Sequence, residues 1–176
     1  MGASEQAPGR SGIRVELRGR GAATIETGLP VLDRLLERLV EYARFDVTLE
    51  VEPGAAEAEV SEAGSALGRA LAGPLREGRG YGSAMMTSSE ALASVALEQS
   101  DAPLLVSNVD LTDARIGGLG TDVARRFLDR FTESAGVTLH VRLLNGTDTQ
   151  HVLEAIFKAL GVALAVACEP KGDVNG

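Results

Sequence analysis

The chain has 176 residues, which suits one domain with a substantial core and no need of disulfides. Its net charge of −8 argues against nucleic acid or an anionic membrane as a partner, because like charges repel. Aromatic residues make up only 3% of the chain and Trp is absent, so we expect a core of Leu, Val, Ile and Ala. The longest apolar run, residues 162–168, is too short to span a bilayer.

The first half of the chain predicts two strands, a helix, a third strand and a second helix, at residues 13–17, 22–26, 31–43, 47–51 and about 61–75. The first helix is indicated by apolar residues that recur at helical spacing. Thr27 can cap this helix, and Pro30 suits its first turn. The third strand is indicated by alternating Val47, Leu49 and Val51.

The second half predicts the same order, with strands at 91–98 and 104–110, a helix opened by Thr121, a strand at 137–143 and a helix at about 149–167. Residues 81–87 are a further strand candidate. A glycine-rich stretch at 117–120 precedes the third helix, where backbone N–H groups can bind phosphate. We interpret it as a flexible turn, because no Lys-Ser/Thr follows.

Two matches in the same order indicate an internal duplication. Residues 47–51 read VTLEV and return at 137–141 as VTLHV, while ALGRAL at 66–71 returns as ALGVAL at 159–164. Each half therefore reads β-β-α-β-α, about residues 13–77 and 81–167. One half cannot cover its own apolar faces, so we predict an α+β fold of two sheets with helices packed between or against them.

We expect a disordered leader at residues 1–12, a single domain at 13–167 and a flexible tail at 168–176. The leader has no apolar segment of the kind found in signal peptides. Cys168, the only cysteine, excludes an internal disulfide and ends an apolar run. We interpret it as a buried residue in a cytoplasmic protein.

Few residues can carry chemistry, since the chain has only two histidines, His140 and His151. His151 and Glu154 are three residues apart and share one face of the last helix, where an imidazole and a carboxylate can meet one cation. The alternative is that both are solvated residues of a first helical turn.

Four segments carry a recognisable pattern: IETGLPVLDRLL at 25–36, SEALA at 89–93, AGVTLHVRLLNG at 135–146 and QHVLEAIFKA at 150–159. They resemble T-G-x-x-F-F-D-H-M-L, D-E-A-L, A-G-L-x-L-H-I-R-L-L-Y-G and H-H-I-I-E-A-x-F-K-A of the imidazoleglycerol-phosphate dehydratases. The resemblance runs from about residue 13 to residue 171.

The resemblance implies two fused half-domains, like those of the ribosomal protein S5 domain 2-like fold. It also implies an activity, the removal of water from imidazole glycerol phosphate in histidine biosynthesis. In the family, histidines and glutamates from neighbouring subunits hold two manganese ions, and trimers assemble into a 24-subunit shell.

Several of the family's metal ligands are replaced in this chain. Arg34 occupies the histidine position of the first motif, and a guanidinium has no lone pair to give. The family's first H-H-x-x-E corresponds to EAEVS at residues 57–61, and Gln150 replaces one histidine of the second. The remaining candidates, which we expect to hold at most one ion, are His140, His151, Glu154 and Glu57.

Candidates for other roles follow from the same comparison. Glu90 matches the glutamate of D-E-A-L and is a candidate proton-transfer group. Arg79 and Lys171 lie near family phosphate-binding positions, and Arg34 is a further anion-binding candidate. Ala102 and Ser89 replace an arginine and an aspartate of the family motifs. The family's N-terminal R-x-T-x-E-T strand is absent.

Three functional hypotheses remain. The leading one is a catalytically inactive homologue without a cofactor, which binds or assembles with other subunits, for instance with a complete dehydratase. The second is a divergent dehydratase or lyase that uses one Mn²⁺ or no metal. The third is a binding module for an anionic metabolite at Arg34. Since metals join the family's trimers, we expect a homo-oligomer that stops at the trimer.

Overall fold

The computed structural model describes residues 11–109, 115–116 and 119–172. These form nine strands and four helices: β1 (Gly12–Glu16), β2 (Ala23–Glu26), α1 (Pro30–Ala43), β3 (Asp46–Glu50), α2 (Ala56–Glu77), β4 (Tyr81–Ser88), β5 (Ala91–Gln99), β6 (Leu104–Ser107), β7 (Arg115–Ile116), β8 (Leu119–Gly120), α3 (Thr121–Ala135), β9 (Val137–Asn145) and α4 (Thr149–Ala167).

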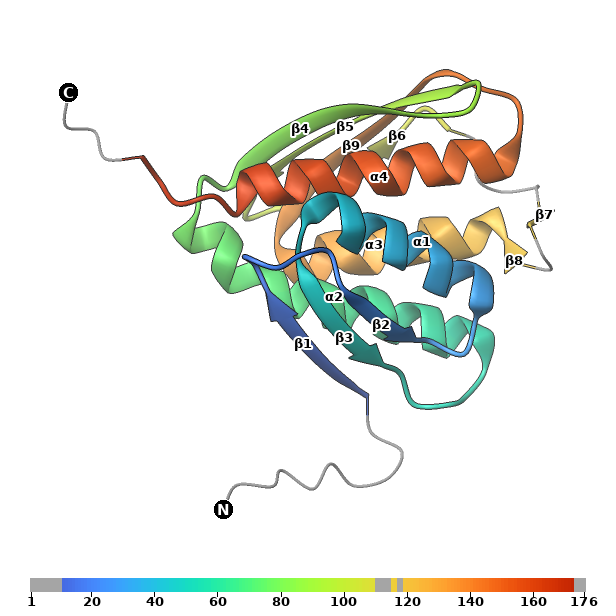
Figure 1. The fold of residues 1–176 in the computed structure, drawn as a ribbon, viewed down its shortest axis with the longest axis horizontal. Coiled ribbons are helices and arrows are strands. Elements are labelled where there is room, and N and C mark those ends of the chain that lie inside the picture. The colour runs from blue at the N-terminus through green and yellow to red at the C-terminus, as the bar shows by residue number, and fades with distance from the viewer. Residues whose placement is uncertain (1–10, 110–114, 117–118, 173–176) are drawn as a thin grey trace.

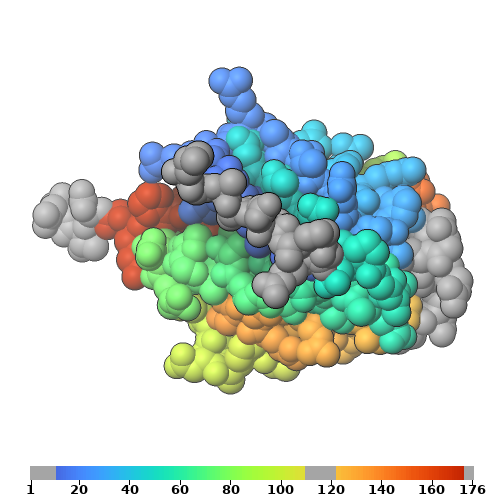
Figure 2. Space-filling view, turned by 90° about the horizontal axis from the view of Figure 1, so that it is seen from below, coloured from blue at the N-terminus to red at the C-terminus, as the bar shows by residue number. Residues whose placement is uncertain are grey.

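Two sheets enclose the helices (Figure 1). The first-half sheet has the strand order β1-β3-β2, and the second-half sheet has the order β4-β5-β9-β6. Within the second half, α4 packs against β4 and β5, and between the halves α1 packs on α4 and α2 on α3. A view from below shows α2, in green, between the blue first-half strands and orange α3 (Figure 2). The predicted α+β fold of two sheets with packed helices is confirmed.

The duplication is visible in the sheets. β3 pairs antiparallel with β1 and parallel with β2, and β9 pairs in the same way with β5 and β6. The candidate strand at 81–87 is β4, which extends the second-half sheet beyond β5. Equivalent glycines permit the close helix crossings, since a Cβ on Gly68 would lie 2.8 Å from Phe131 O and one on Gly161 would lie 2.3 Å from Leu39 O.

The core differs from the expected composition in one respect. All four phenylalanines of the chain are fully buried: Phe45, Phe127, Phe131 and Phe157. Phe127 stacks on Phe131 and lies 5.7 Å, centroid to centroid, from Phe157. Three of the four phenylalanines therefore form one cluster between α3 and α4. Burial also explains α4, the one described helix that is long and apolar enough to cross a membrane, because 61% of its apolar 18-residue stretch lies inside the protein.

Two local predictions are wrong. The second helix begins at Ala56 rather than near Ser61. Its first turn has no apolar repeat, and carboxylates there are favoured by the helix dipole. Thr27 does not cap α1, whose N-cap is Leu29. The Thr27 hydroxyl instead accepts a bond from Leu29 N–H and donates to Asp33, which fixes the turn before the helix.

The predicted leader and tail fall only in part within the described residues. β1 begins at Gly12, the last residue of the predicted leader, and the rest of that leader up to residue 10 lies outside the described residues. At the other end, Glu169 O accepts a hydrogen bond from Arg79 N–H, and Pro170 forms a bridge with Gly78. The first residues of the predicted tail are therefore bound to the domain.

Candidate functional site

The N-terminus of α4 meets the turn between β4 and β5, and this junction holds a hydrogen-bonded set of charged groups. His151 Nδ1 lies 2.6 Å from Glu90 Oε2. The backbone N–H of Asp148 donates to Glu90 Oε1 at 2.9 Å. Asp148 is the N-cap of α4, and its Oδ1 accepts the His151 backbone N–H at 3.1 Å. Glu90 is therefore held at both carboxylate oxygens.

The hairpin places Glu90 here. Ser88 pairs with Ala91, which leaves Ser89 and Glu90 as a two-residue turn, and Ser89 has a φ of 49°. Two further hydrogen bonds attach the hairpin tip to α4. The Ser88 hydroxyl donates to Glu154 Oε2 at 2.8 Å. Lys158 Nζ donates to Thr87 O at 3.2 Å. Residues that are about 60 apart in the sequence thus form one cluster.

The pKa values of the central pair move in opposite directions. Hydrogen bonds from the backbone N–H groups of Asp148 and of Glu90 itself, and then the contact with His151, lower the pKa of Glu90 to about 2. The hydrogen bond to Glu90 raises the pKa of His151, and the charges of Asp148 and Glu90 act in the same direction. Because Glu90 binds Nδ1, it fixes the orientation of the ring and leaves Nε2 to exchange a proton with a bound molecule. The pair is thus suited to proton transfer.

The pair should give folding stability a defined pH dependence. Because the pKa of His151 is raised, its protonated ring stabilises the fold. This stabilisation is fully present below the unfolded pKa near 6.5 and is lost as pH rises through the folded pKa. Because the pKa of Glu90 is lowered, its ionised carboxylate also stabilises the fold. This stabilisation is present above the unfolded pKa of 4.5 and is lost as pH falls through the folded pKa of about 2. We expect the difference in unfolding free energy between the native chain and Glu90→Gln to be largest from about pH 4.5 to 6.5. Urea denaturation from pH 5 to 9 measures it, and a difference that grows with pH would contradict the pairing.

The other predicted metal residues lie elsewhere. His140 projects from the exposed side of β9, opposite Ala96 on β5 and Val106 on β6. Glu57 is exposed on α2 and lies 3.8 Å from Arg126. Of the four candidates, the structure brings together only His151 and Glu154, which share the first turns of α4 and contact the same hairpin.

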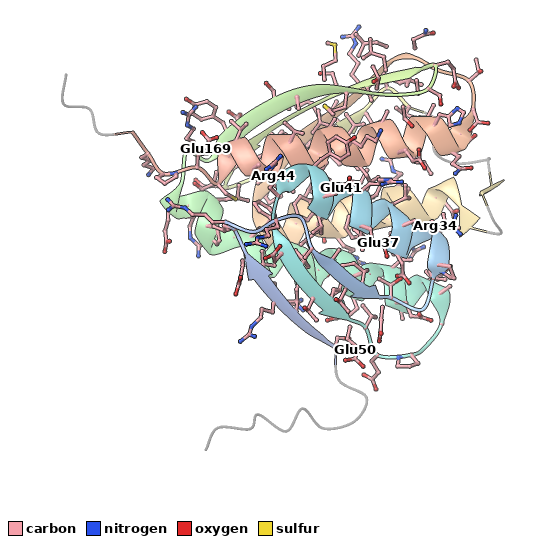
Figure 3. The ribbon with its side chains drawn as sticks, in the orientation of Figure 1. Arg34, Glu37, Glu41, Arg44, Glu50 and Glu169 are labelled. Atoms are coloured by element: carbon pink, nitrogen blue, oxygen red, sulfur yellow. The ribbon has the colours of Figure 1, made fainter. Side chains whose placement is uncertain are left out.

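The predicted phosphate-binding residues do not gather around this cluster. Arg34 lies on the exposed side of α1, in line with Glu37 and Glu41 (Figure 3). Arg79 lies 3.4 Å from Glu169 near the C-terminal end of α4. Lys171 is exposed in the segment that follows. No common phosphate site therefore forms from these residues within one chain.

A single chain does not fit a pair of metal ions. Across the described residues, no three His, Cys, Asp or Glu side chains are grouped so that they can hold a metal. Within this part of the chain, Glu59 Oε2 is buried without a hydrogen-bond partner, and the side chain lies against Gly28. One isolated carboxylate is too few for a divalent ion, which requires several ligands. Any complete metal site would need residues of a second chain.

Three residues of the cluster were not predicted from the sequence: Asp148, Ser88 and Lys158. Asp148 has a recognisable signal, because Asp directly before a helix is a common N-cap. Ser88 and Lys158 have none, since their roles depend on the approach of the hairpin to α4. Of the glycine-rich stretch at 117–120, residues 117 and 118 lie outside the described residues, and the other two form β8.

Comparison with known proteins decides the family. The model of the imidazoleglycerol-phosphate dehydratase family matches residues 27–164. The chain belongs to the imidazoleglycerol-phosphate dehydratase family. The corresponding enzyme of Aromatoleum aromaticum is 40% identical over 162 residues, which cover 89% of this chain and 83% of the relative. That of Syntrophobacter fumaroxidans is 41% identical over 152 residues, covering 83% and 77%.

Solved structures agree with this family assignment. The crystal structure of the imidazoleglycerol-phosphate dehydratase of Staphylococcus aureus superposes with a TM-score of 0.83 at 25% identity, covering 92% of this chain and 95% of that one. A Pyrococcus furiosus imidazoleglycerol-phosphate dehydratase, solved in complex with (S)-C348, gives 0.81 at 27% identity, covering 95% and 94%. The fold and family expected from the four sequence motifs are thus confirmed.

Proposed function

We propose that this chain is a divergent dehydratase of histidine biosynthesis that removes water from imidazole glycerol phosphate with one metal ion or none. The observation that carries the proposal is the Glu90–His151 pair, which joins two residues at family motif positions in a 2.6 Å contact. Relatives with 40% identity are named as this enzyme, which supports the same reaction. Dehydration needs a proton removed and a proton supplied to the leaving hydroxyl, and an oriented imidazole serves either step.

A second candidate is a catalytically inactive homologue with a binding or assembly role, including assembly with a complete dehydratase subunit. It is favoured by the separation of His140, Glu57 and Arg34 from the cluster at α4. The replacement of histidine positions by Arg34 and Gln150 points in the same direction. A role as an anion-binding module at Arg34 has less support, because Arg34 lies apart from the other predicted phosphate ligands.

A dehydration assay with metal analysis separates the two candidates. The purified chain is incubated with imidazole glycerol phosphate, once with Mn²⁺ and once with a chelator, and bound manganese is measured in parallel. We expect turnover with no more than one manganese ion per chain. Binding of substrate without turnover in either condition would reject the enzyme and support the inactive homologue. Turnover with two bound ions would show that the metal pair is intact.

The oligomeric state and the location belong to the same proposal. We propose a cytoplasmic homo-oligomer, because the solved relatives have this fold and the metal-site residues of one chain lie apart. A trimer is favoured over a 24-subunit shell if the second metal has been lost. Light scattering distinguishes a mass near three chains of 18.3 kDa from one several times larger.

A further inference from the structure

The duplicated halves differ by one strand. In the second half, β4 pairs along the outer side of β5 and gives that sheet four strands. β1 is the counterpart of β5, because each pairs antiparallel with the strand that lies inside its sheet, β3 or β9. Among the described residues, no strand lies on the other side of β1, which is an edge of the first-half sheet (Figure 1). Within this part of the chain, the first half therefore lacks a counterpart of β4.

The apolar side of β1 is incompletely covered as a result. Ile13 pairs with Leu49, and its counterpart is Leu97, which pairs with Leu139 at the matching position. Leu97 also has Gly82 of β4 beside it and is only 4% exposed. Ile13 packs against the core but remains half-buried. A strand added beside β1 would give Ile13 the cover that Leu97 already has.

The helix behind β1 shows the same difference. The repeated stretches at 66–71 and 159–164 make Ala70 of α2 the counterpart of Ala163 of α4. β4 crosses α4 so closely that a Cβ on Gly82 would lie 2.2 Å from Ala163 O. No described strand crosses α2 at the corresponding place, and Ala70 is half-buried.

An open seam therefore runs between β1 and α2, and we call it the β1–α2 seam. A Cβ on Gly73 would meet no atom of another element within 4 Å. Pro74 has no N–H to donate to Ala70 O, which is left without its usual helical bond. Cavities lie at both ends of the seam, one of about 420 Å³ beside Glu62 and one of about 410 Å³ lined by Leu17 and Pro74.

We infer that the β1–α2 seam binds an extended peptide segment of another protein, which joins the first-half sheet as a strand beside β1. An edge strand presents unpaired N–H and C=O groups, and such groups bind extended peptides by strand addition. β4 indicates which side chains fit, because those that it turns toward α4 include the small residues Gly82, Ala84 and Ser88. We therefore expect a partner segment with small side chains at alternate positions. The inference goes beyond the proposed dehydratase, since the seam belongs to the first half and the Glu90–His151 pair to the second.

The first ten residues of the chain are the alternative occupant, and their sequence suits the seam poorly. They contain no β-branched or aromatic residue, the types that strands favour. Pro8 also lacks the N–H that a paired strand donates. These sequence features favour a segment of another protein over the chain's own first residues.

A labelled peptide with the β4 sequence, YGSAMMTS, tests strand addition to the full chain. We expect saturable binding by fluorescence anisotropy, no binding of a scrambled peptide, and slower hydrogen–deuterium exchange at residues 12–16 but not at the edge strand β6. Alternate amides of a strand point to opposite edges, so N-methylation of one alternating set should weaken binding about tenfold and methylation of the other set should not. Equal affinities for the two methylated peptides, or slower exchange at β6 instead of β1, would overturn the inference.

Substitution within the seam locates the binding. Ser65 of α2 is half-buried and is the counterpart of Lys158, which donates to Thr87 O in β4. We expect Ser65→Trp to weaken peptide binding about tenfold, because the indole fills the seam. Thr48→Trp, on the outer face of the same sheet, is the matched control and should bind as the native chain does. Native affinity in a Ser65→Trp variant that circular dichroism shows to be folded would contradict the proposed site.

Removal of residues 1–10 distinguishes the two occupants. If the seam is open to another protein, the shortened chain and the full chain should bind the peptide with equal affinity. Binding by the shortened chain alone would show that the first residues already occupy the seam, and the inference would then be wrong.

Discussion

Gly161→Ala is expected to lower the unfolding free energy by about 3 kcal/mol, because it inserts a methyl group between two helices in backbone contact. The added Cβ would lie 2.3 Å from Leu39 O and 3.1 Å from Ala43 N. Both atoms belong to the backbone of α1, which cannot rotate away as a side chain can. The helices must separate instead, and the packing of α1 on α4 joins the two halves.

Gly73→Ala is the matched control for this substitution. Gly73 lies in α2, and a Cβ there would meet no atom of another element within 4 Å. Alanine favours the helix, but Gly73 precedes Pro74, whose ring crowds the Cβ of a preceding helical residue, so we expect the two effects to offset and the unfolding free energy to change by less than about 1 kcal/mol. Chemical denaturation measures both variants. A Gly161→Ala variant as stable as the native chain would contradict the close backbone contact between α1 and α4.

His151→Ala is expected to reduce the dehydration rate about 10²- to 10⁴-fold, the range for loss of a general acid or base. The expected loss follows from the Glu90 contact, which orients the ring for proton exchange at Nε2. Glu90→Gln retains a side chain of the same shape but removes the charge that raises the His151 pKa. For Glu90→Gln, we therefore expect a smaller loss and a pH–rate profile shifted to lower pH.

The control for these rate measurements is Glu133→Gln, which also removes one exposed carboxylate. Glu133 lies on α3, where it bonds Arg130 and contacts no residue of the cluster. The dehydration rate and pH–rate profile of Glu133→Gln should match those of the native chain. A native rate for His151→Ala would show that proton transfer does not depend on the Glu90–His151 pair.

Much of the candidate site could be named from the sequence, but its geometry could not. Glu90, His151 and Glu154 were identified from motif positions, yet nothing in the sequence indicates that Glu90 contacts His151. That contact depends on the β4–β5 turn approaching the start of α4, from residues 61 positions away. Likewise, His140 was named as a metal-ligand candidate from a motif position, but nothing in the sequence indicates that β9 turns its side chain to the outer face of the sheet.

The sequence by itself determined the periodic elements, the duplication and the family. Helical and strand spacings are local, and they decide which face of each element is apolar. The tertiary structure alone decided what each face meets. It brought Phe127, Phe131 and Phe157 together from α3 and α4, and it left large apolar side chains exposed on the strands of one sheet alone. The reason is physical, because burial and charge pairing depend on segments that are distant along the chain, which local periodicity does not record.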